Sequence, residues 1–355
     1  MAEFAPFFLR NIWYYALPSQ TLAKGKMVAK TLLGEPVLFA RKDDGTVFAL
    51  RDVCPHRAMP LSCGRFDGSE VECCYHGWKF DKEGVCRDIP WLTGHEAIDP
   101  TNIKVRTYPV IETQGNIWIF MSEKPGVTAD VSVQKPPVLP GIGNDAQAGL
   151  WTSSLFPCHM DHAVIGLMDP AHGPFVHQAW WWRGKASIHE KAKAFGASPF
   201  GFVMKKHKPS SNSFGYKILG GVPETEIFFA LPGVRIEHIQ IGQEKNKHHV
   251  INLTCVTPIS ETETEITHLI YWTQPWLGLI KPFFRPFMEG FIKQDKDVVA
   301  KQQVGLRHEK SMLLLKDADT PARWYFQLKQ EYVKALSESR TFNNPVPDVT
   351  LRWRS

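Results

Sequence analysis

The chain lacks a long uninterrupted apolar run. Its most hydrophobic stretch, residues 268–292, contains Lys281, Arg285 and three prolines, whereas a membrane-spanning helix needs about 20 predominantly apolar residues. No small-residue cleavage site of a secretory signal peptide follows the N-terminal residues. We therefore expect a cytoplasmic protein without a transmembrane segment. Trp and Phe beside basic residues in this stretch would also suit a membrane surface, although we expect them to form core or pocket lining.

Clusters of like charge are also missing. The 41 Lys and Arg exceed the 36 Asp and Glu by a formal net charge of +5, and they are spread along the chain without basic runs. This distribution argues against nucleic-acid binding. The seven cysteines are an odd count, and without an export signal they favour metal ligands and free thiols over a disulfide framework.

Aromatic residues, in contrast, are abundant. The 355 residues include 12 Trp and 22 Phe, and a chain of this length is typical of two domains with substantial cores. Short apolar runs around turn signals such as Asp43-Asp44-Gly45 predict an all-β first part. Pro, Gly and Asp then mark a linker, and mixed helix and strand patterns follow. We expect an α+β protein with a domain at 1–125, a linker at 126–145 and a second domain at 146–355.

Two short pairs of potential metal ligands stand out in the first part. Cys54 and His56 are separated by one residue, and Cys73 and His76 by two, with 16 residues between the pairs. Two thiolates and two imidazoles suit a tetrahedral zinc site. They equally suit a Rieske 2Fe–2S centre, in which two cysteines hold one iron and two histidines the other. The short Gly- and Pro-containing loops favour the Rieske cluster, and we expect the other five cysteines to be buried or free thiols.

A second group of ligands lies in the second part, in the pattern D-x-x-H-x-x-x-x-H formed by Asp169, His172 and His177. Helical periodicity over about 158–172 places Asp169 and His172 on one face. Gly173-Pro174 should end that helix and let His177 turn back toward a shared metal. Two histidines with one carboxylate form the facial triad of mononuclear iron oxygenases.

A carboxylate that completes the triad is expected further along the chain. Winding residues 284–302 as a helix places Asp295 on an apolar face and Asp297 on the opposite side, near Lys293 and Lys301. The Asp295 face also carries Phe284, Met288, Phe291, Val298 and Gln302. A carboxylate among apolar side chains is costly unless it is paired or binds a metal. We expect Asp295 to be the third ligand, with solvated Asp297 and an ion-paired Asp295 as alternatives.

These motifs, in this order, resemble the terminal oxygenases of the Rieske non-haem iron family over nearly the whole chain. The stretch "DPAHGPFVH" is similar to the pheophorbide a oxygenase and vanillate demethylase-like branch. The resemblance implies a helix-grip (START-like) catalytic domain, a homotrimer, and a ferredoxin or flavin reductase as electron donor. It also implies that Asp169 bridges His76 of one chain and His172 of its neighbour. Many relatives carry Asn where this chain has Gly166, and His162 is a candidate to replace it.

The resemblance further implies an oxygenase that uses O₂, NAD(P)H-derived electrons, a 2Fe–2S cluster and mononuclear Fe(II). The expected reaction is hydroxylation or oxidative demethylation of a hydrophobic, aromatic substrate. From the position of the apolar segments, we expect the substrate pocket to include Leu167, Phe175, Leu269 and Trp272. A Rieske electron-transfer protein, or a module that binds hydrophobic ligands without mononuclear iron, remains the alternative.

Overall fold

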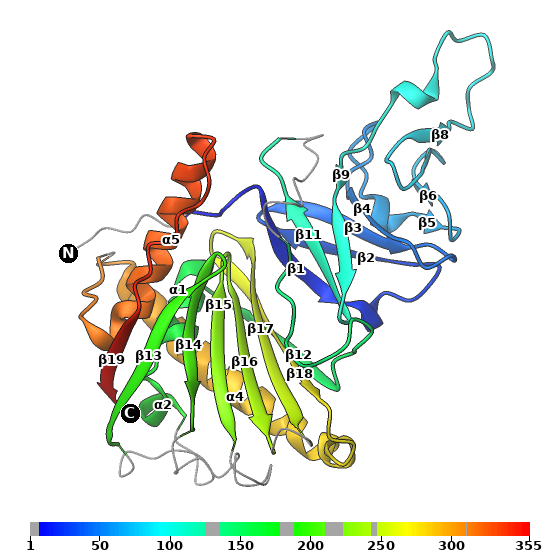
Figure 1. The fold of residues 1–355 in the computed structure, drawn as a ribbon. Coiled ribbons are helices and arrows are strands. Elements are labelled where there is room, and N and C mark those ends of the chain that lie inside the picture. Colours follow the sequence, from blue (N-terminus) through cyan, green and yellow to red (C-terminus); the bar gives the residue numbers. More distant parts are fainter. Residues whose placement is uncertain (1–6, 125–134, 178–187, 210–222, 243–246, 310) are drawn as a thin grey trace. The chain divides into compact units, whose positions relative to one another are not determined.

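The computed structural model describes residues 7–124, 135–177, 188–209, 223–242, 247–309 and 311–355 (Figure 1). The chain forms two compact units, Arg10–Pro136 and Pro137–Ser355, and the N-terminal segment Met1–Leu9 belongs to the second of them. Of the linker predicted at 126–145, residues 126–134 lie outside the described residues. The predicted domain limits therefore stay a prediction, although the change of unit at Pro136 falls within that linker.

The unit Arg10–Pro136 consists of strands and short 3₁₀ helices. Its three antiparallel sheets have the orders β1-β11-β10, β2-β3-β4-β9 and β5-β6-β7-β8. The turn signal at Asp43-Asp44-Gly45 connects β3 to β4, with Gly45 at a φ of 95° that favours glycine. The bounds are β1 Ile12–Pro18, β2 Lys26–Leu32, β3 Glu35–Arg41, β4 Val47–Arg51, β5 Arg65–Phe66, β6 Val71–Glu72, β7 Lys79–Phe80, β8 Cys86–Asp88, β9 Thr107–Tyr108, β10 Val110–Thr113, β11 Asn116–Met121, η1 Ser19–Thr21, η2 Leu61–Cys63 and η3 Pro100–Asn102.

The second unit is built on one eight-stranded antiparallel sheet, in the order β12-β18-β17-β16-β15-β14-β13-β19. Strands β13 to β18 pair in chain order, β12 pairs with β18 at one edge, and the last strand of the chain joins the other edge beside β13. The strands are β12 Leu150–Phe156, β13 Glu190–Ser198, β14 Gly201–His207, β15 Glu224–Ala230, β16 Val234–Ile241, β17 His248–Ser260, β18 Glu263–Trp272 and β19 Val349–Arg354.

The second unit also contains helices, and Figure 1 shows α4 running behind the strands of the sheet. The helices are α1 Met160–Met168, α2 Gly173–Val176, α4 Leu277–Leu306, α5 Thr320–Ser337 and the 3₁₀ helix η6 Asp317–Asp319. Helix α5 packs its aromatic face on the sheet, with the Tyr325 and Phe229 rings 5.8 Å apart. Helix α1 contacts α4, α5, β17 and β18. The architecture agrees with the predicted α+β class. Among the described residues, no helix is both long and apolar enough to cross a membrane.

The predicted helix at about 158–172 is wrong at its end. Helix α1 stops at Met168, and Asp169 has an extended backbone with φ −65° and ψ 115°. The reason is Pro170, because a proline disfavours helical geometry in the residue before it. Gly173-Pro174 does not break a helix but begins α2, since proline suits the first helical turn. Asp169 and His172 therefore share a loop and not a helix face.

Candidate active site

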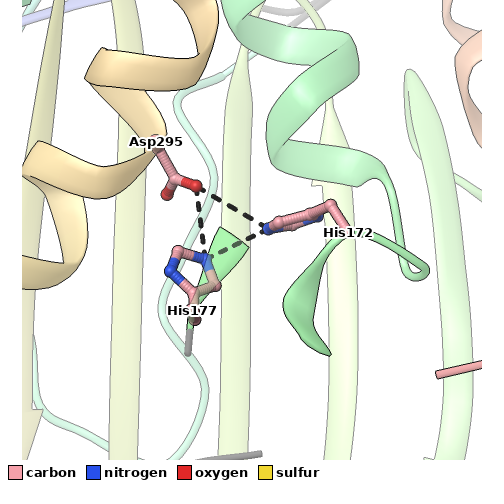
Figure 2. A group of neighbouring side chains, drawn as sticks. All are labelled: His172, His177 and Asp295. Atoms are coloured by element: carbon pink, nitrogen blue, oxygen red, sulfur yellow. Dashed lines mark hydrogen bonds and ion pairs between the residues drawn. The ribbon is translucent and has the colours of Figure 1, made fainter. Parts of the chain in front are cut away.

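Three side chains that are far apart in the sequence meet in the second unit (Figure 2). His172 immediately precedes α2, His177 follows it, and Asp295 lies on α4. The Nε2 atoms of the two histidines are 3.2 Å apart, and Asp295 Oδ1 lies 3.2 Å from His177 Nε2 and 3.8 Å from His172 Nε2. One ligand atom from each residue lies within 4.8 Å of the others. Two imidazoles and one carboxylate in this arrangement fit a mononuclear metal ion with open coordination positions.

The other nitrogen of each imidazole is already engaged. His172 Nδ1 donates to the main-chain carbonyl of Asp169 at 2.7 Å, and His177 Nδ1 lies 3.0 Å from the side-chain oxygen of Gln294. The His177 ring also stacks on Phe291, with ring centroids 3.5 Å apart. Partners of this kind fix the tautomer and the ring orientation of a metal-binding histidine. Both Nε2 atoms are thereby directed at the Asp295 carboxylate.

The structure separates Asp295 from the alternative carboxylate, Asp297. Asp297 is exposed and pairs with Lys293 at 2.6 Å. The predicted inward face is wrong toward the end of the helix, where Val298 is exposed and Val299 is buried instead. The aromatic residues that served to orient this face, Phe284 and Phe291, line the cavity described below, so they do not mark the packed core.

Asp169 lies beside the triad. Its carboxylate accepts a hydrogen bond from the Ala171 amide at 2.7 Å, and Oδ2 is 3.9 Å from His172 Nδ1. Burial raises the pKa of this carboxyl above its ordinary value, against the effect of the Ala171 amide and of His172. The bridge from the Asp169 carboxylate to a second chain stays a prediction.

The two Cys/His pairs of the first unit occupy loops with the same hydrogen-bond pattern. The Cys54 amide donates to the Met59 carbonyl, and the Cys54 carbonyl accepts from Ala58; the second loop repeats this with Cys73, Trp78 and Gly77. Ala58 and Gly77 both have positive φ, 56° and 73°. Each loop therefore turns back on its cysteine in the same way, although the two motifs differ in length by one residue.

The donor set of these loops fits a Rieske cluster. The Cys54 and Cys73 thiols are buried, and the His56 and His76 rings lie 4.4 Å apart. Burial and the neighbouring Cys73 raise the pKa of Cys54 to about 11, and a thiolate in such a place requires a cationic partner. His76 Nδ1 is buried without a hydrogen-bond partner among the described residues. A bound iron would satisfy both groups. All seven cysteines are free.

A cavity of about 830 Å³ opens onto the triad. Its wall includes His172, His177 and Asp295, together with a mainly apolar set: Leu167, Phe195, Phe202, Met204, Ile227, Phe229, Ile270, Phe287, Met288, Phe291 and Ile292. A large, mostly apolar cavity with a few polar groups is typical of a small-molecule site.

Of the four pocket residues expected from the sequence, Leu167 lines the cavity. Phe175 is exposed, and Leu269 is fully buried on the sheet face opposite to His268 and Ile270, because side chains alternate along a strand. Trp272 packs near the end of β18 against another apolar cluster. These three expectations are therefore corrected: Phe175, Leu269 and Trp272 do not line the cavity.

Several polar residues of the mainly apolar cavity wall were not predicted from the sequence. Arg235, Glu237, Asn252 and His268 lie on neighbouring strands and face the cavity. Arg235 pairs with Glu237 at 3.3 Å, and His268 Nδ1 lies 2.9 Å from Thr254 Oγ1. Burial lowers the pKa of His268 to about 4, so its ring is neutral at pH 7. The signal in the sequence was a polar residue at every second position of an otherwise apolar strand.

Gly166 and His162 lie on α1 away from these groups. Gly166 is exposed, and an added Cβ would meet no atom within 4 Å. His162 does not line the cavity, and its Nδ1 atom is buried without a partner among the described residues. The structure shows no contact between His162 and the triad. It therefore does not support the expectation that His162 replaces the Asn that relatives carry at the position of Gly166.

Comparison with protein families gives two matches. The Rieske [2Fe-2S] domain matches residues 12–109, and the Vanillate O-demethylase oxygenase C-terminal domain matches residues 157–334, half of the chain. Dicamba O-demethylase, oxygenase component, of Stenotrophomonas maltophilia is 34% identical over 176 residues, 48% of each chain. Protein TIC 55 of Arabidopsis thaliana is 25% identical over 323 residues, 89% of this chain and 56% of the relative. The chain thus spans about half the length of these relatives.

Solved structures show the same fold. The crystal structure of dicamba monooxygenase bound to dicamba superimposes with a TM-score of 0.68 at 22% identity, covering 95% of this chain and 100% of the other. Pseudomonas putida NdmA with caffeine gives a TM-score of 0.69 at 17% identity, covering 92% and 91%. With both domain matches and this architecture, the chain belongs to the family of Rieske oxygenases, the mononuclear-iron oxygenases whose catalytic domain is of the vanillate O-demethylase type.

Proposed function

We propose that the protein is the terminal oxygenase of a multicomponent Rieske system. It would use O₂ and NAD(P)H-derived electrons to hydroxylate or oxidatively demethylate a hydrophobic, aromatic substrate. The observation that carries this proposal is the meeting of His172, His177 and Asp295 at the wall of an apolar cavity. The same chain holds a second ligand set suited to an electron-transfer cluster.

Cys54, His56, Cys73 and His76 would hold the 2Fe–2S cluster, and His172, His177 and Asp295 would hold the mononuclear iron. When bound, the cluster supplies single electrons and the ferrous iron activates O₂. The protein residues supply orientation. Gln294 and the Asp169 carbonyl hold the two imidazoles with their Nε2 atoms facing Asp295.

The cavity supports an aromatic substrate. Its phenylalanine and aliphatic side chains bind a ring and exclude water, which strengthens the polar contacts that remain. Asn252 Oδ1 is buried without a partner among the described residues and offers an acceptor for a hydroxyl or amine of the substrate. The names of the relatives agree with this class: dicamba O-demethylase, and a toluene-4-sulfonate monooxygenase subunit of Comamonas testosteroni.

The proposed assembly and partners extend beyond one chain. We infer a cytoplasmic homotrimer fed by a ferredoxin, a flavin reductase or both. Within the trimer, Asp169 would link His76 of one chain to His172 of the next. The Asp169 main-chain carbonyl holds His172, and the carboxylate, 3.9 Å from His172 Nδ1, would bond the imidazole of the next chain. One residue would then connect the two ligands through a short polar path.

The decisive experiment is an anaerobic measurement of iron and acid-labile sulfide per chain, with EPR of the reduced protein and of the protein treated with nitric oxide. About three irons and two sulfides, a Rieske signal and a separate ferrous–nitrosyl signal are expected. About two irons without a nitrosyl signal after ferrous reconstitution would leave an electron carrier or a ligand-binding protein. Zinc in both places would overturn the proposal.

A further inference from the structure

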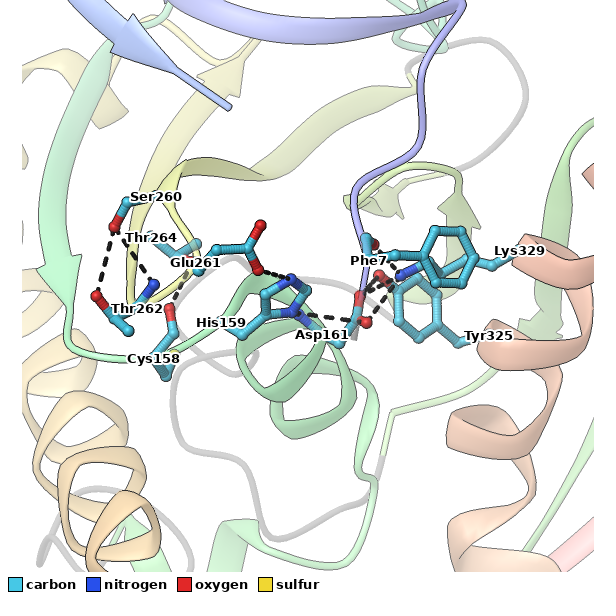
Figure 3. A network of polar contacts seen from close by, with 10 residues as sticks. All are labelled: Phe7, Cys158, His159, Asp161, Ser260, Glu261, Thr262, Thr264, Tyr325 and Lys329. Atoms are coloured by element: carbon cyan, nitrogen blue, oxygen red, sulfur yellow. Dashed lines mark hydrogen bonds and ion pairs between the residues drawn. The ribbon is translucent and has the colours of Figure 1, made fainter. Parts of the chain in front are cut away.

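A buried ion pair connects two helices of the second unit (Figure 3). Lys329 on α5 and Asp161 in the first turn of α1 have side chains only 1% and 2% exposed. The Lys329 ammonium donates to both carboxylate oxygens of Asp161, at 2.6 and 2.8 Å. A pair this deeply buried persists only when the geometry is good and the remaining donors are satisfied.

The remaining donor is satisfied by the N-terminal segment. The Lys329 ammonium donates to the Phe7 carbonyl at 2.6 Å, and its nitrogen lies 4.1 Å from the centroid of the Phe7 ring. The Tyr325 hydroxyl donates to Asp161 Oδ1 at 2.5 Å. All three ammonium protons therefore have acceptors. We call Phe7, Asp161, Tyr325 and Lys329 the clasp.

The N-terminal segment makes a second contact at the start of α1. The Phe8 ring stacks on His159, the residue that caps α1, with centroids 4.8 Å apart and planes within 5°. His159 Nδ1 accepts from the Asp161 amide at 3.2 Å. Leu9, the next residue, is buried. Residues that precede the Rieske unit in the sequence thus complete the packing around one end of α1.

The other end of α1 leads directly to the candidate iron ligands. Met168 ends the helix, the Asp169 carbonyl accepts from His172, and α2 then carries the chain to His177. A displacement of α1 along its axis would shift this loop against Asp295, which lies on another helix. The clasp is a buried, directional contact that opposes such a displacement, together with the hydrogen bond from Thr264 to the Cys158 carbonyl just before α1. Apolar packing alone has little directionality.

We propose that the clasp is a positioning device for the iron site. It fixes α1 so that His172 and His177 meet Asp295, and it makes the N-terminal segment a required part of the catalytic unit. The inference rests on the proposed iron site. The residues of the clasp are not among those that line the cavity, although the Tyr325 ring packs on Phe229 of the cavity wall. The ion pair of Lys329 with Asp161 therefore acts through the position of α1.

The test uses protein that keeps its Rieske cluster but has lost its mononuclear iron. Fe(II) is added back anaerobically, and its binding is measured by the ferrous–nitrosyl EPR signal. In the double variant D161N/K329M both charges are replaced together, so no lone charge stays buried. The matched control is E331Q/R340M, which removes an ion pair at 2.5 Å that Glu331 of the same helix makes with Arg340, away from α1. Thermal unfolding of each variant reports any general loss of stability.

We expect D161N/K329M to bind Fe(II) at least about tenfold more weakly, with a broadened nitrosyl signal, as when a partner of a metal ligand is lost. The control should bind as the wild type does. Phe7→Ala keeps both charges paired and should weaken binding less, which gives a test if the double variant does not fold.

Wild-type Fe(II) affinity in D161N/K329M, or in F7A if only that variant folds, would overturn the positioning role while the proposed function stands. Equal losses in the double variant and in E331Q/R340M would also overturn it, because a general loss of stability would then explain both. Failure of the wild type to bind Fe(II) at all would instead contradict the proposed function.

Discussion

The Nδ1 atom of His177 lies 3.0 Å from the side-chain oxygen of Gln294, the residue that immediately precedes Asp295. One turn of α4 therefore supplies both a candidate metal ligand and the group that orients another. Phe291, on the previous turn, holds the same imidazole by stacking. The three contacts make the orientation of His177 a property of α4, although the histidine itself follows α2.

Replacing Gln294 by Ala should weaken Fe(II) binding by about 10–100-fold, because the imidazole loses the acceptor that fixes its tautomer. Q294E restores an acceptor and should recover most of the affinity. Fe(II) titration of both variants, with the Rieske absorption as an internal standard, checks this expectation. Equal affinity of Q294A and the wild type would show that Phe291 alone orients the ring.

Asp295→Asn should remove the mononuclear iron and leave the cluster in place. The expected content falls from about three irons to about two, with the Rieske signal unchanged. Asp297→Asn is the matched control, since it breaks only an exposed pair with Lys293 on the same helix. Loss of iron from D297N and not from D295N would reverse the assignment.

The distinction between these two aspartates was available from the sequence, because helical periodicity alone places them on different faces. The position of Asp169, in contrast, could not be predicted from the sequence. Its place outside α1 depends on a local steric effect of Pro170, which the apolar pattern over 158–172 conceals. The polar side chains of the cavity wall, such as Asn252 and Arg235, required the strand register to be known.

The N-terminal segment was harder still to assign. Phe7 and Phe8 precede the strands of the first unit in the sequence, so chain order predicts that they belong to it. Their partners Lys329 and His159 are more than 150 residues away, and no local pattern encodes such a contact. Long-range pairings of buried charges become visible only when the fold is known.

Glu35 should make the stability of the Rieske unit dependent on pH. Burial raises the pKa of its carboxyl, but hydrogen bonds from Tyr108 and Arg10, with the charge of Arg106, outweigh burial and bring it below 4.5. Because the folded pKa is the lower one, the contribution is fully present above pH 4.5 and is lost as the pH falls through the folded value.

E35Q should therefore lower the stability of this unit at pH 7 by about 1–3 kcal/mol, the usual cost of unpairing a hydrogen-bonded charge. It should also flatten the stability profile below pH 4.5. Denaturant unfolding followed by the tryptophan fluorescence of the unit, at several pH values, provides the measurement. If the stability of E35Q and of the wild type fell equally as the pH was lowered, the loss of stability in acid would belong to other carboxylates.

Gly166 is predicted to tolerate a side chain. Because a Cβ there would meet no atom within 4 Å and the residue is helical, G166A should raise stability by about 0.5–1 kcal/mol. Fe(II) affinity should stay unchanged, since the position does not contact the triad. Thermal unfolding and iron titration test the two statements separately, and a destabilised G166A would reveal a neighbour that covers this face of α1.

Asp169→Asn separates two roles of Asp169: its main-chain carbonyl holds His172, and its carboxylate is proposed to link two chains. His172 is held by the main-chain carbonyl of Asp169, which the substitution retains, so both metal sites should stay loaded. The carboxylate, 3.9 Å from His172 Nδ1, is the group proposed to reach the next chain, and turnover should therefore fall to near background. Asp319→Asn, which alters another nearby carboxylate, serves as the control. Reduced D169N protein with both EPR signals and full turnover would show that electrons reach the iron without this carboxylate, whereas loss of the nitrosyl signal would show that the carboxylate mainly supports His172.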